Sequence, residues 1–131
     1  MYEMKKEYFT GIQLIDEEHA QLFDYANQIY ALLKDEFIAD KYDNIRDLLQ
    51  KLMDYAKKHF ADEEAYMESI QYKRIFTQKM QHQVFVDELE KYDLEEIDEA
   101  ENQEAVISKM LTFVTDWLVE HILNVDTLIG K

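Results

Sequence analysis

Hydrophobic positions recur every three or four residues in four separate stretches of the chain. This spacing is typical of amphipathic helices, because it aligns the apolar side chains along one face. We therefore predict helices over residues 15–37, 42–68, 73–94 and 102–128. The predicted inward faces comprise, in chain order, Ile15, His19, Leu22, Ala26, Ile29 and Leu33; Ile45, Leu48, Leu52, Ala56, His59, Glu63, Met67 and Ile70; Gln78, His82, Phe85, Leu89 and Tyr92; and Ile107, Leu111, Val114, Leu118, His121, Val125 and Leu128.

Turn-forming residues are scarce, which argues against a many-stranded sheet. The chain has no proline and only two glycines, Gly11 and Gly130, and neither lies between predicted helices. A sheet needs such residues at each reversal of the chain. Four helices joined by short links instead predict an all-α, antiparallel up-down-up-down four-helix bundle. Residues 1–14 form an N-terminal arm, and a length of 131 residues suits one domain over the whole chain.

The composition restricts the classes of partner and ligand. The formal net charge is −15, and so acidic a protein repels the phosphates of nucleic acids and anionic lipids. We therefore expect neither nucleic acid nor a membrane as a partner. The chain has no cysteine, so histidines and carboxylates are the only strong metal ligands available. No apolar run reaches the roughly 18 residues of a membrane span and no signal-peptide core follows the start, which predicts a cytoplasmic protein.

The histidines fall on the faces that are predicted to point inward. All four do so: His19, His59, His82 and His121. Glu63 follows His59 by four residues, which at about 100° per residue puts it on the same face, one turn along. A buried carboxylate without a partner is costly, so an inward glutamate among inward histidines calls for a compensating cation. A metal ion would supply that charge.

Asp126 adds a sixth donor, although its position is less clear. It follows His121 by five residues, an offset of about 140° on an ideal helix, so the spacing alone does not place it inward. Six donors exceed the four ligands of one tetrahedral zinc, and they suit two ions bridged by carboxylates inside a four-helix bundle. Imidazole with carboxylate favours iron, manganese or zinc. A mononuclear site of two histidines and one carboxylate is the weaker alternative.

Four segments resemble, in order, the ligand segments of bacterial hemerythrins: GIQLIDEEH (11–19), HFADEEAYM (59–67), QKMQH (78–82) and WLVEHILNVD (117–126). The resemblance implies a non-heme centre of two iron ions that binds O2 reversibly, with Glu63 and Asp126 as bridges beside a bridging oxygen. His19 and His59 would hold the iron that has the O2 position. His82 and His121 would hold the other. The apolar pocket around O2 would consist of Leu22, Phe60, Trp117, Leu118 and Ile122.

One position departs from the pattern of that family. The third segment begins with Gln78 where the family has a histidine. Without that imidazole a second coordination position opens on the iron of His82 and His121, unless the Gln78 amide oxygen or a water fills it. A neutral amide oxygen is a weaker donor than imidazole. We therefore expect weaker iron binding and easier solvent access on this side.

The sequence thus predicts an O2-binding protein for oxygen storage, delivery or sensing, with O2 or another small diatomic molecule as its ligand. The first alternative is an enzyme that acts on peroxide or nitric oxide, because two open positions on neighbouring irons could turn either of them over. The second is an iron-sensing or structural module, in which the ligands only join the helices. The sequence indicates neither a protein partner nor an oligomeric state.

Overall fold

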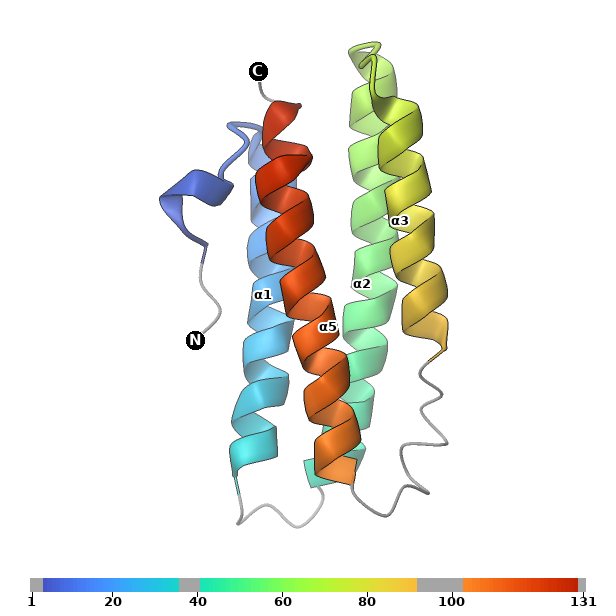
Figure 1. Cartoon of the computed structure of the whole chain (residues 1–131). Helices are drawn as coiled ribbons and strands as arrows, with labels where there is room; N and C mark the ends of the chain where they lie inside the picture. The colour runs from blue at the N-terminus through green and yellow to red at the C-terminus, as the bar shows by residue number, and fades with distance from the viewer. Residues whose placement is uncertain (1–3, 36–40, 92–102, 130–131) are drawn as a thin grey trace.

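The computed structural model describes residues 4–35, 41–91 and 103–129. Its long helices are α1 (Gln13–Lys34), α2 (Lys41–Ser69), α3 (Ile75–Glu90) and α5 (Gln103–Asn124), and its short 3-10 helices are η1 (Lys6–Tyr8) and η2 (Asp126–Leu128). Successive long helices run in opposite directions within one bundle (Figure 1). All regular structure in these ranges is helical, so the predicted up-down-up-down four-helix bundle is confirmed.

A polar turn sets the start of α1, two residues before the predicted start at 15. The carboxylate of Asp16 accepts hydrogen bonds from the backbone N–H of Thr10 (2.8 Å) and of Gly11 (3.1 Å), and from the Thr10 hydroxyl (2.8 Å). Gly11 takes a φ of +85°, which glycine adopts without strain. These contacts fix the angle at which the arm enters the helix. The other end of α1 is Lys34 rather than 37, because Asp35 is extended.

The remaining helix ends lie close to their predicted positions, with one informative exception. α2 extends one residue beyond the prediction at each end, and α3 begins at 75 rather than 73 and ends at 90. Three predicted positions lie outside the described residues: the end of the third helix at 94, Tyr92 on its inward face, and the start of the fourth helix at 102. α5 ends at Asn124 rather than 128, because Val125 has φ −125° and ψ −58° and a 3-10 turn follows. Val125 and Leu128 are therefore only half-buried.

The predicted inward faces are buried with few exceptions. Every predicted position on α1 is buried. On α2, Leu48 is only half-buried and the neighbouring Leu49 lies in the core, because a helical period of 3.6 residues shifts the buried face along a long helix. Ile70 was predicted inward but is 45% exposed, since it follows the end of α2 and Gln71 takes a positive φ of 54°.

The buried apolar side chains form two clusters with a polar zone between them. The larger cluster fills most of the bundle and includes Leu22 on α1. The smaller one, which we call the apolar cap, consists of Ile15, Met67 and Ile129. His19 lies between Ile15 and Leu22 in the sequence of α1. The histidine region is thus closed by hydrophobic packing on both sides along the bundle axis.

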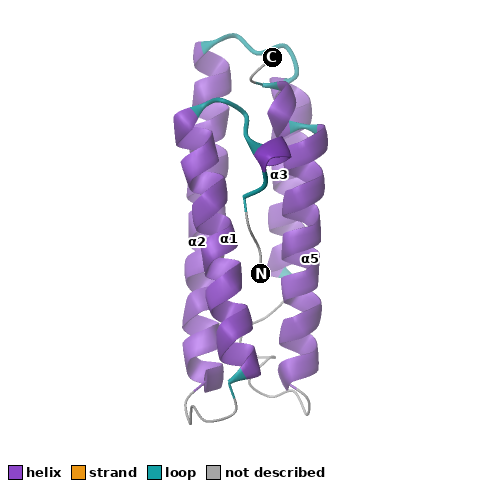
Figure 2. Ribbon diagram, turned by 90° about the vertical axis from the view of Figure 1, so that its left-hand side faces the viewer, coloured by secondary structure: helices purple, strands orange, loops and turns teal. Residues whose placement is uncertain are grey.

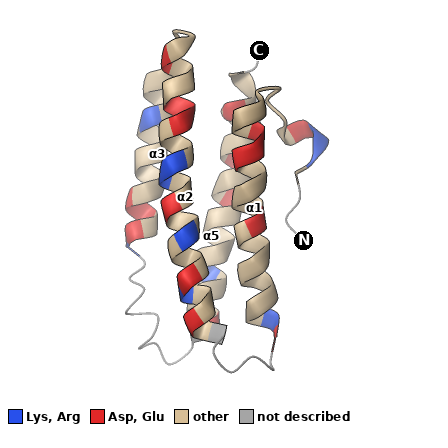
Figure 3. Cartoon of the chain, turned by 180° about the vertical axis from the view of Figure 1, so that it is seen from behind, with Lys and Arg blue, Asp and Glu red and all other residues tan. Residues whose placement is uncertain are grey.

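The N-terminal arm and the surface charges complete the fold. The arm crosses the face formed by α1 and α5 (Figure 2), and Tyr8 of η1 stacks on Phe23 at 6.0 Å between ring centroids. Acidic residues are spread along the helices (Figure 3), and they outnumber basic ones, 29 to 14 in the whole chain. Within the described ranges, none of the helices combines the length and the apolar character needed to span a membrane.

Candidate metal centre

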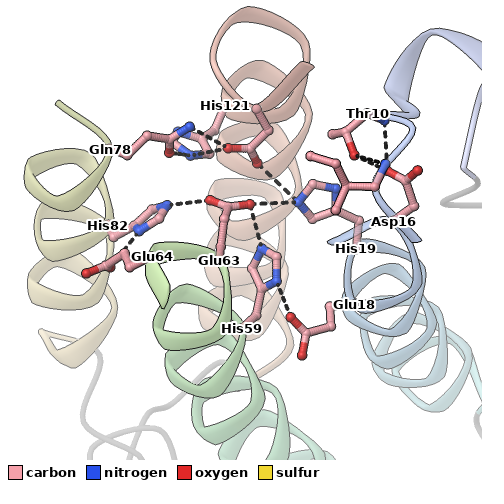
Figure 4. Close-up of polar contacts among 12 residues, drawn as sticks. Thr10, Asp16, Glu18, His19, His59, Glu63, Glu64, Gln78, His82 and His121 are labelled. Atoms are coloured by element: carbon pink, nitrogen blue, oxygen red, sulfur yellow. Dashed lines mark hydrogen bonds and ion pairs between the residues drawn. The ribbon is translucent and has the colours of Figure 1, made fainter. Parts of the chain in front are cut away.

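All of the histidines and both predicted carboxylates meet at one buried place between the helices (Figure 4). α1 contributes one histidine, α2 a histidine and a glutamate, α3 and α5 one histidine each, and η2 an aspartate. None of these side chains exposes more than about 5% of its surface. In chain order they are His19, His59, Glu63, His82, His121 and Asp126.

One half of the centre joins α1 and α2. The Nε2 atom of His19 lies 3.1 Å from Oδ2 of Asp126 and 3.7 Å from Oε2 of Glu63. The Nε2 atom of His59 lies 3.5 Å from the same Glu63 oxygen. One ligand atom from each of these four residues falls within 4.8 Å of the others, a spacing that suits a single metal ion.

The other half joins α3 and α5 and uses the opposite oxygens of the same carboxylates. The Nε2 atom of His82 lies 3.0 Å from Oε1 of Glu63, and that of His121 lies 3.0 Å from Oδ1 of Asp126. These four residues form a second group within 4.8 Å. Each carboxylate therefore turns one oxygen to each pair of histidines. Carboxylates placed in this way would suit two metal ions, one in each half.

The histidines are oriented by acceptors on their outer nitrogens. Nδ1 of His59 lies 3.0 Å from Oε1 of Glu18, and Nδ1 of His82 lies 2.9 Å from Oε2 of Glu64. Carboxylates accept hydrogen bonds, so each Nδ1 carries a proton, and the neutral ring that binds a metal has its lone pair on Nε2, which faces the centre. An imidazole held in this way is a typical metal ligand.

The pKa values of the metal-free protein also indicate that the centre favours positive charge. Burial lowers the pKa of His19, but the carboxylates of Asp126 and Glu63 outweigh burial and raise it to about 9. The pKa of His82 also rises, because Glu63 outweighs the effect of burial. Burial raises the pKa of Asp126, but His121 and His19 overcome this and hold it below its usual range. Protons therefore supply the positive charge when no metal does.

Several buried polar atoms of the centre make no well-aligned hydrogen bond, and they test whether a metal fits. Both oxygens of Glu63 and Nε2 of His82 are in this state, as is Nδ1 of His19. Buried polar atoms are otherwise almost always hydrogen-bonded. Glu63 and His82 turn these atoms toward the middle of the centre, where the ligand atoms converge (Figure 4). The donor set therefore fits a pair of metal ions.

Comparison with known proteins identifies the family. A family model described as the hemerythrin HHE cation binding domain matches residues 10–131. The chain belongs to the hemerythrin family. It is 46% identical to a bacteriohemerythrin of Clostridium acetobutylicum over 126 residues, 96% of each chain. It is 32% identical to a bacteriohemerythrin of Methylococcus capsulatus (95% of this chain, 89% of the relative) and to a myohemerythrin of Sipunculus nudus (87% and 78%). The predicted resemblance is confirmed.

In this hemerythrin, Gln78 lies inside the centre rather than beside it. Its side chain is fully buried on α3, one turn before His82. Its amide nitrogen donates to Oδ1 of Asp126 at 3.0 Å, and its amide oxygen lies 3.0 Å from Nε2 of His121. The structure thus places the amide at the half of the centre formed by α3 and α5.

The predicted pocket residues surround the hemerythrin centre unevenly. Leu22, Leu118 and Ile122 are buried in the larger apolar cluster. Phe60 stacks on the ring of His82 at 4.1 Å between centroids, with 11° between the planes. Trp117, which is only half-buried, stacks in the same way on His121 at 4.4 Å. The two aromatic rings thus cover the half of the centre formed by α3 and α5.

The sequence analysis missed the residues that hold the histidines, and these follow a regular pattern. Glu18 on α1 contacts His59 on α2, Glu64 on α2 contacts the histidine of α3, and Gln81 on α3 contacts Nδ1 of His121 on α5 at 2.9 Å. In each case the residue next to a predicted ligand on one helix orients the histidine of the following helix. In the sequence, each of these residues can be recognised only as a polar residue next to a predicted ligand. Which histidine it contacts depends on how the helices pack against one another.

Proposed function

We propose that this chain binds O2 reversibly at a pair of non-heme iron ions, for oxygen storage, delivery or sensing. Glu63 and Asp126 bridge the two ions in this proposal. His19 and His59 hold the ion at which O2 binds, and the histidines of α3 and α5 hold the other.

The observation that carries the proposal is the sharing of two carboxylates between two pairs of histidines. Glu63 lies 3.0 Å from His82 through one oxygen and 3.5 Å from His59 through the other. Asp126 joins His19 and His121 in the same way, at 3.1 and 3.0 Å. A centre built for one ion would not need this duplication. Imidazole and carboxylate donors without sulfur are the ligands that suit non-heme iron.

The protein itself holds, orients and shields the centre. The Nδ1–H groups of His59 and His82 bond to Glu18 and Glu64 and so keep the Nε2 lone pairs aimed inward. Glu18 is balanced in turn by Lys58, whose Nζ lies 3.0 Å away. The apolar surroundings exclude water, which slows proton delivery and the irreversible oxidation of bound iron. Iron(II) ions held at the centre would supply the electrons that are transferred to O2 when it binds.

The proposal is tested by loading the metal-free protein with iron(II) without oxygen, then recording iron content and absorption spectra before and after air. We expect two irons per chain, a new visible absorption band in air, and its disappearance under vacuum. Two irons with an irreversible change on first exposure would overturn reversible binding. Continuous consumption of peroxide or nitric oxide in the presence of a reductant would instead indicate an enzyme.

A third outcome would indicate an iron-sensing or structural module. In that case iron would bind and raise the melting temperature, because a ligand of the folded state stabilises it, but air would add no absorption band. The absorption spectra, the consumption of peroxide or nitric oxide, and the melting temperature together separate the three functions.

A further inference from the structure

We propose that Gln78 is a metal ligand through its amide oxygen, and that it completes the half of the centre formed by α3 and α5. This inference rests on the proposed diiron function. The sequence led us to expect an open coordination position and weak iron binding in this half. The inference instead fills that position, so a small ligand binds in the half formed by α1 and α2.

The orientation of the amide is fixed by its neighbour. Oδ1 of Asp126 belongs to a carboxylate and only accepts hydrogen bonds, so the NH2 group of Gln78 must face it, at 3.0 Å. The amide oxygen is then the atom that lies 3.0 Å from Nε2 of His121. Figure 4 shows the amide lying against the ring of His121. The side chain is completely buried, so no bulk water competes for either contact.

The atom that faces the amide oxygen is a potential metal ligand. Nδ1 of His121 lies 2.9 Å from the amide oxygen of Gln81 and donates to it, so a metal ion would bind this ring through Nε2. Oδ1 of Asp126 is 3.0 Å from that same Nε2. When a metal ion replaces the proton on Nε2, the Gln78 oxygen and Nε2 of His121 both turn lone pairs to the same place, 3.0 Å apart. A cation between them removes the repulsion.

Counting the donors of each half shows what the amide changes. The half formed by α3 and α5 has two imidazoles, two carboxylate oxygens and the Gln78 oxygen, which makes five protein donors. The half formed by α1 and α2 has two imidazoles and two carboxylate oxygens, which makes four. With one bridging oxygen, a six-coordinate ion is complete in the first half and has one open position in the second. Gln78 therefore makes the two ions unequal.

The decisive experiment is an anaerobic calorimetric titration of the metal-free protein with iron(II), which measures iron binding without O2. Gln78→Leu removes the donor at similar size, and Gln83→Leu, an exposed position on the same helix, is the matched control. We expect Gln78→Leu to weaken one of the two iron sites at least about tenfold and leave the other unchanged. Gln83→Leu should leave both unchanged.

Two further variants keep the inference testable if leucine prevents folding. Gln78→Asn retains the amide but shortens its reach, and should weaken the same iron site. Gln78→Glu retains both the reach and an oxygen donor, and should keep both sites. Unchanged iron affinities in Gln78→Leu or Gln78→Asn, with only a lower melting temperature of the metal-free protein, would show that the amide merely fills the core.

Azide, a small anion that occupies open positions on iron, gives a second measurement on the oxidised, iron-loaded protein. We expect one azide per chain for the wild type and two for Gln78→Leu. Two azides for the wild type would overturn the inference. A wild type that binds two irons and O2 but fails these tests refutes only the role of Gln78. A wild type that binds no iron pair refutes the proposed function and this inference together.

Discussion

Oδ1 of Asp126 lies 3.0 Å from Nε2 of His121, although five residues separate them along the chain. On a continuous α-helix the two side chains would diverge by about 140°. The helix instead ends at Asn124, and Val125 leaves the helical conformation with φ −125° and ψ −58°. Asp126 therefore turns back toward the bundle as the first residue of a 3-10 turn. The end of the helix therefore brings the second carboxylate into contact with the histidines of both halves.

Because Asp126 serves both halves, its replacement should affect both iron sites. Asp126→Asn keeps the shape and an oxygen but removes the negative charge that faces His19 at 3.1 Å and His121 at 3.0 Å. We expect both iron affinities to fall at least about tenfold, whereas Gln78→Leu should change only one. Asp116→Asn, an exposed position on the same helix, is the control in the calorimetric titration. A loss confined to one site would show that Asp126 does not bridge.

The stability of the metal-free protein should fall as the pH rises above neutrality. The pKa of His19 is raised from 6.5 to about 9, because the carboxylates of Asp126 and Glu63 outweigh the effect of burial. Below pH 6.5 His19 is protonated in both the folded and the unfolded state, and its stabilisation is fully present. It is lost progressively between pH 6.5 and 9, by roughly 3 kcal/mol in the free energy of unfolding.

Acid has the opposite effect through the carboxylates. The pKa values of Asp126 and Glu63 lie below their unfolded values of 3.8 and 4.5, because the histidine contacts overcome burial. Their stabilisation is present above those values and is lost as the pH falls below them. Urea denaturation of the metal-free protein at intervals from pH 3 to 9 should therefore show a maximum between about pH 5 and 6.5. A flat profile from pH 6.5 to 9 would contradict the charge assignment of His19.

The sequence was enough to predict the bundle and most of the centre, because both depend on helical periodicity. His19, His59, His82 and Glu63 each occupy an inward position that can be counted from the apolar stripe around them. Asp126 could not be placed by counting, since its position depends on where α5 ends. The apolar period continues through Val125 and Leu128, so counting carries the helix past Asn124, where it ends.

The residues that orient the histidines could not be predicted for a different reason. Glu18, Glu64 and Gln81 lie beside the inward stripes, and each acts on the histidine of another helix. Periodicity describes one helix at a time and does not give the rotation of one helix relative to the next. The direction of the Gln78 amide depends on that same packing, so the sequence left open whether it fills a coordination position.

Removing one of these orienting contacts should weaken iron binding without removing a ligand. Glu18→Gln replaces the carboxylate that accepts from His59 and that lies 3.0 Å from the exposed Lys58. Such outer contacts typically change metal affinity by about 10- to 100-fold. The neighbouring Glu17 is exposed and faces away, so Glu17→Gln is the matched control. Equal iron affinities for the two variants in the anaerobic titration would show that Glu18 does not support the centre.

The apolar cap should protect the centre from water as well as stabilise the fold. Met67 is fully buried beside Ile15 and Ile129, one turn beyond Glu63 on α2. Met67→Ala should reduce the free energy of unfolding by about 2–5 kcal/mol through lost contacts and a residual cavity. The iron-loaded variant should also oxidise faster in air, because water gains access to the carboxylate of Glu63.

The control is Ile70→Ala, at a position that is 45% exposed on the same end of the bundle. It should change the free energy of unfolding by less than about 0.5 kcal/mol and leave the oxidation rate unaltered. Urea denaturation and the decay of the absorption band measure the two effects, and equal oxidation rates in both variants would mean that the cap has no shielding role.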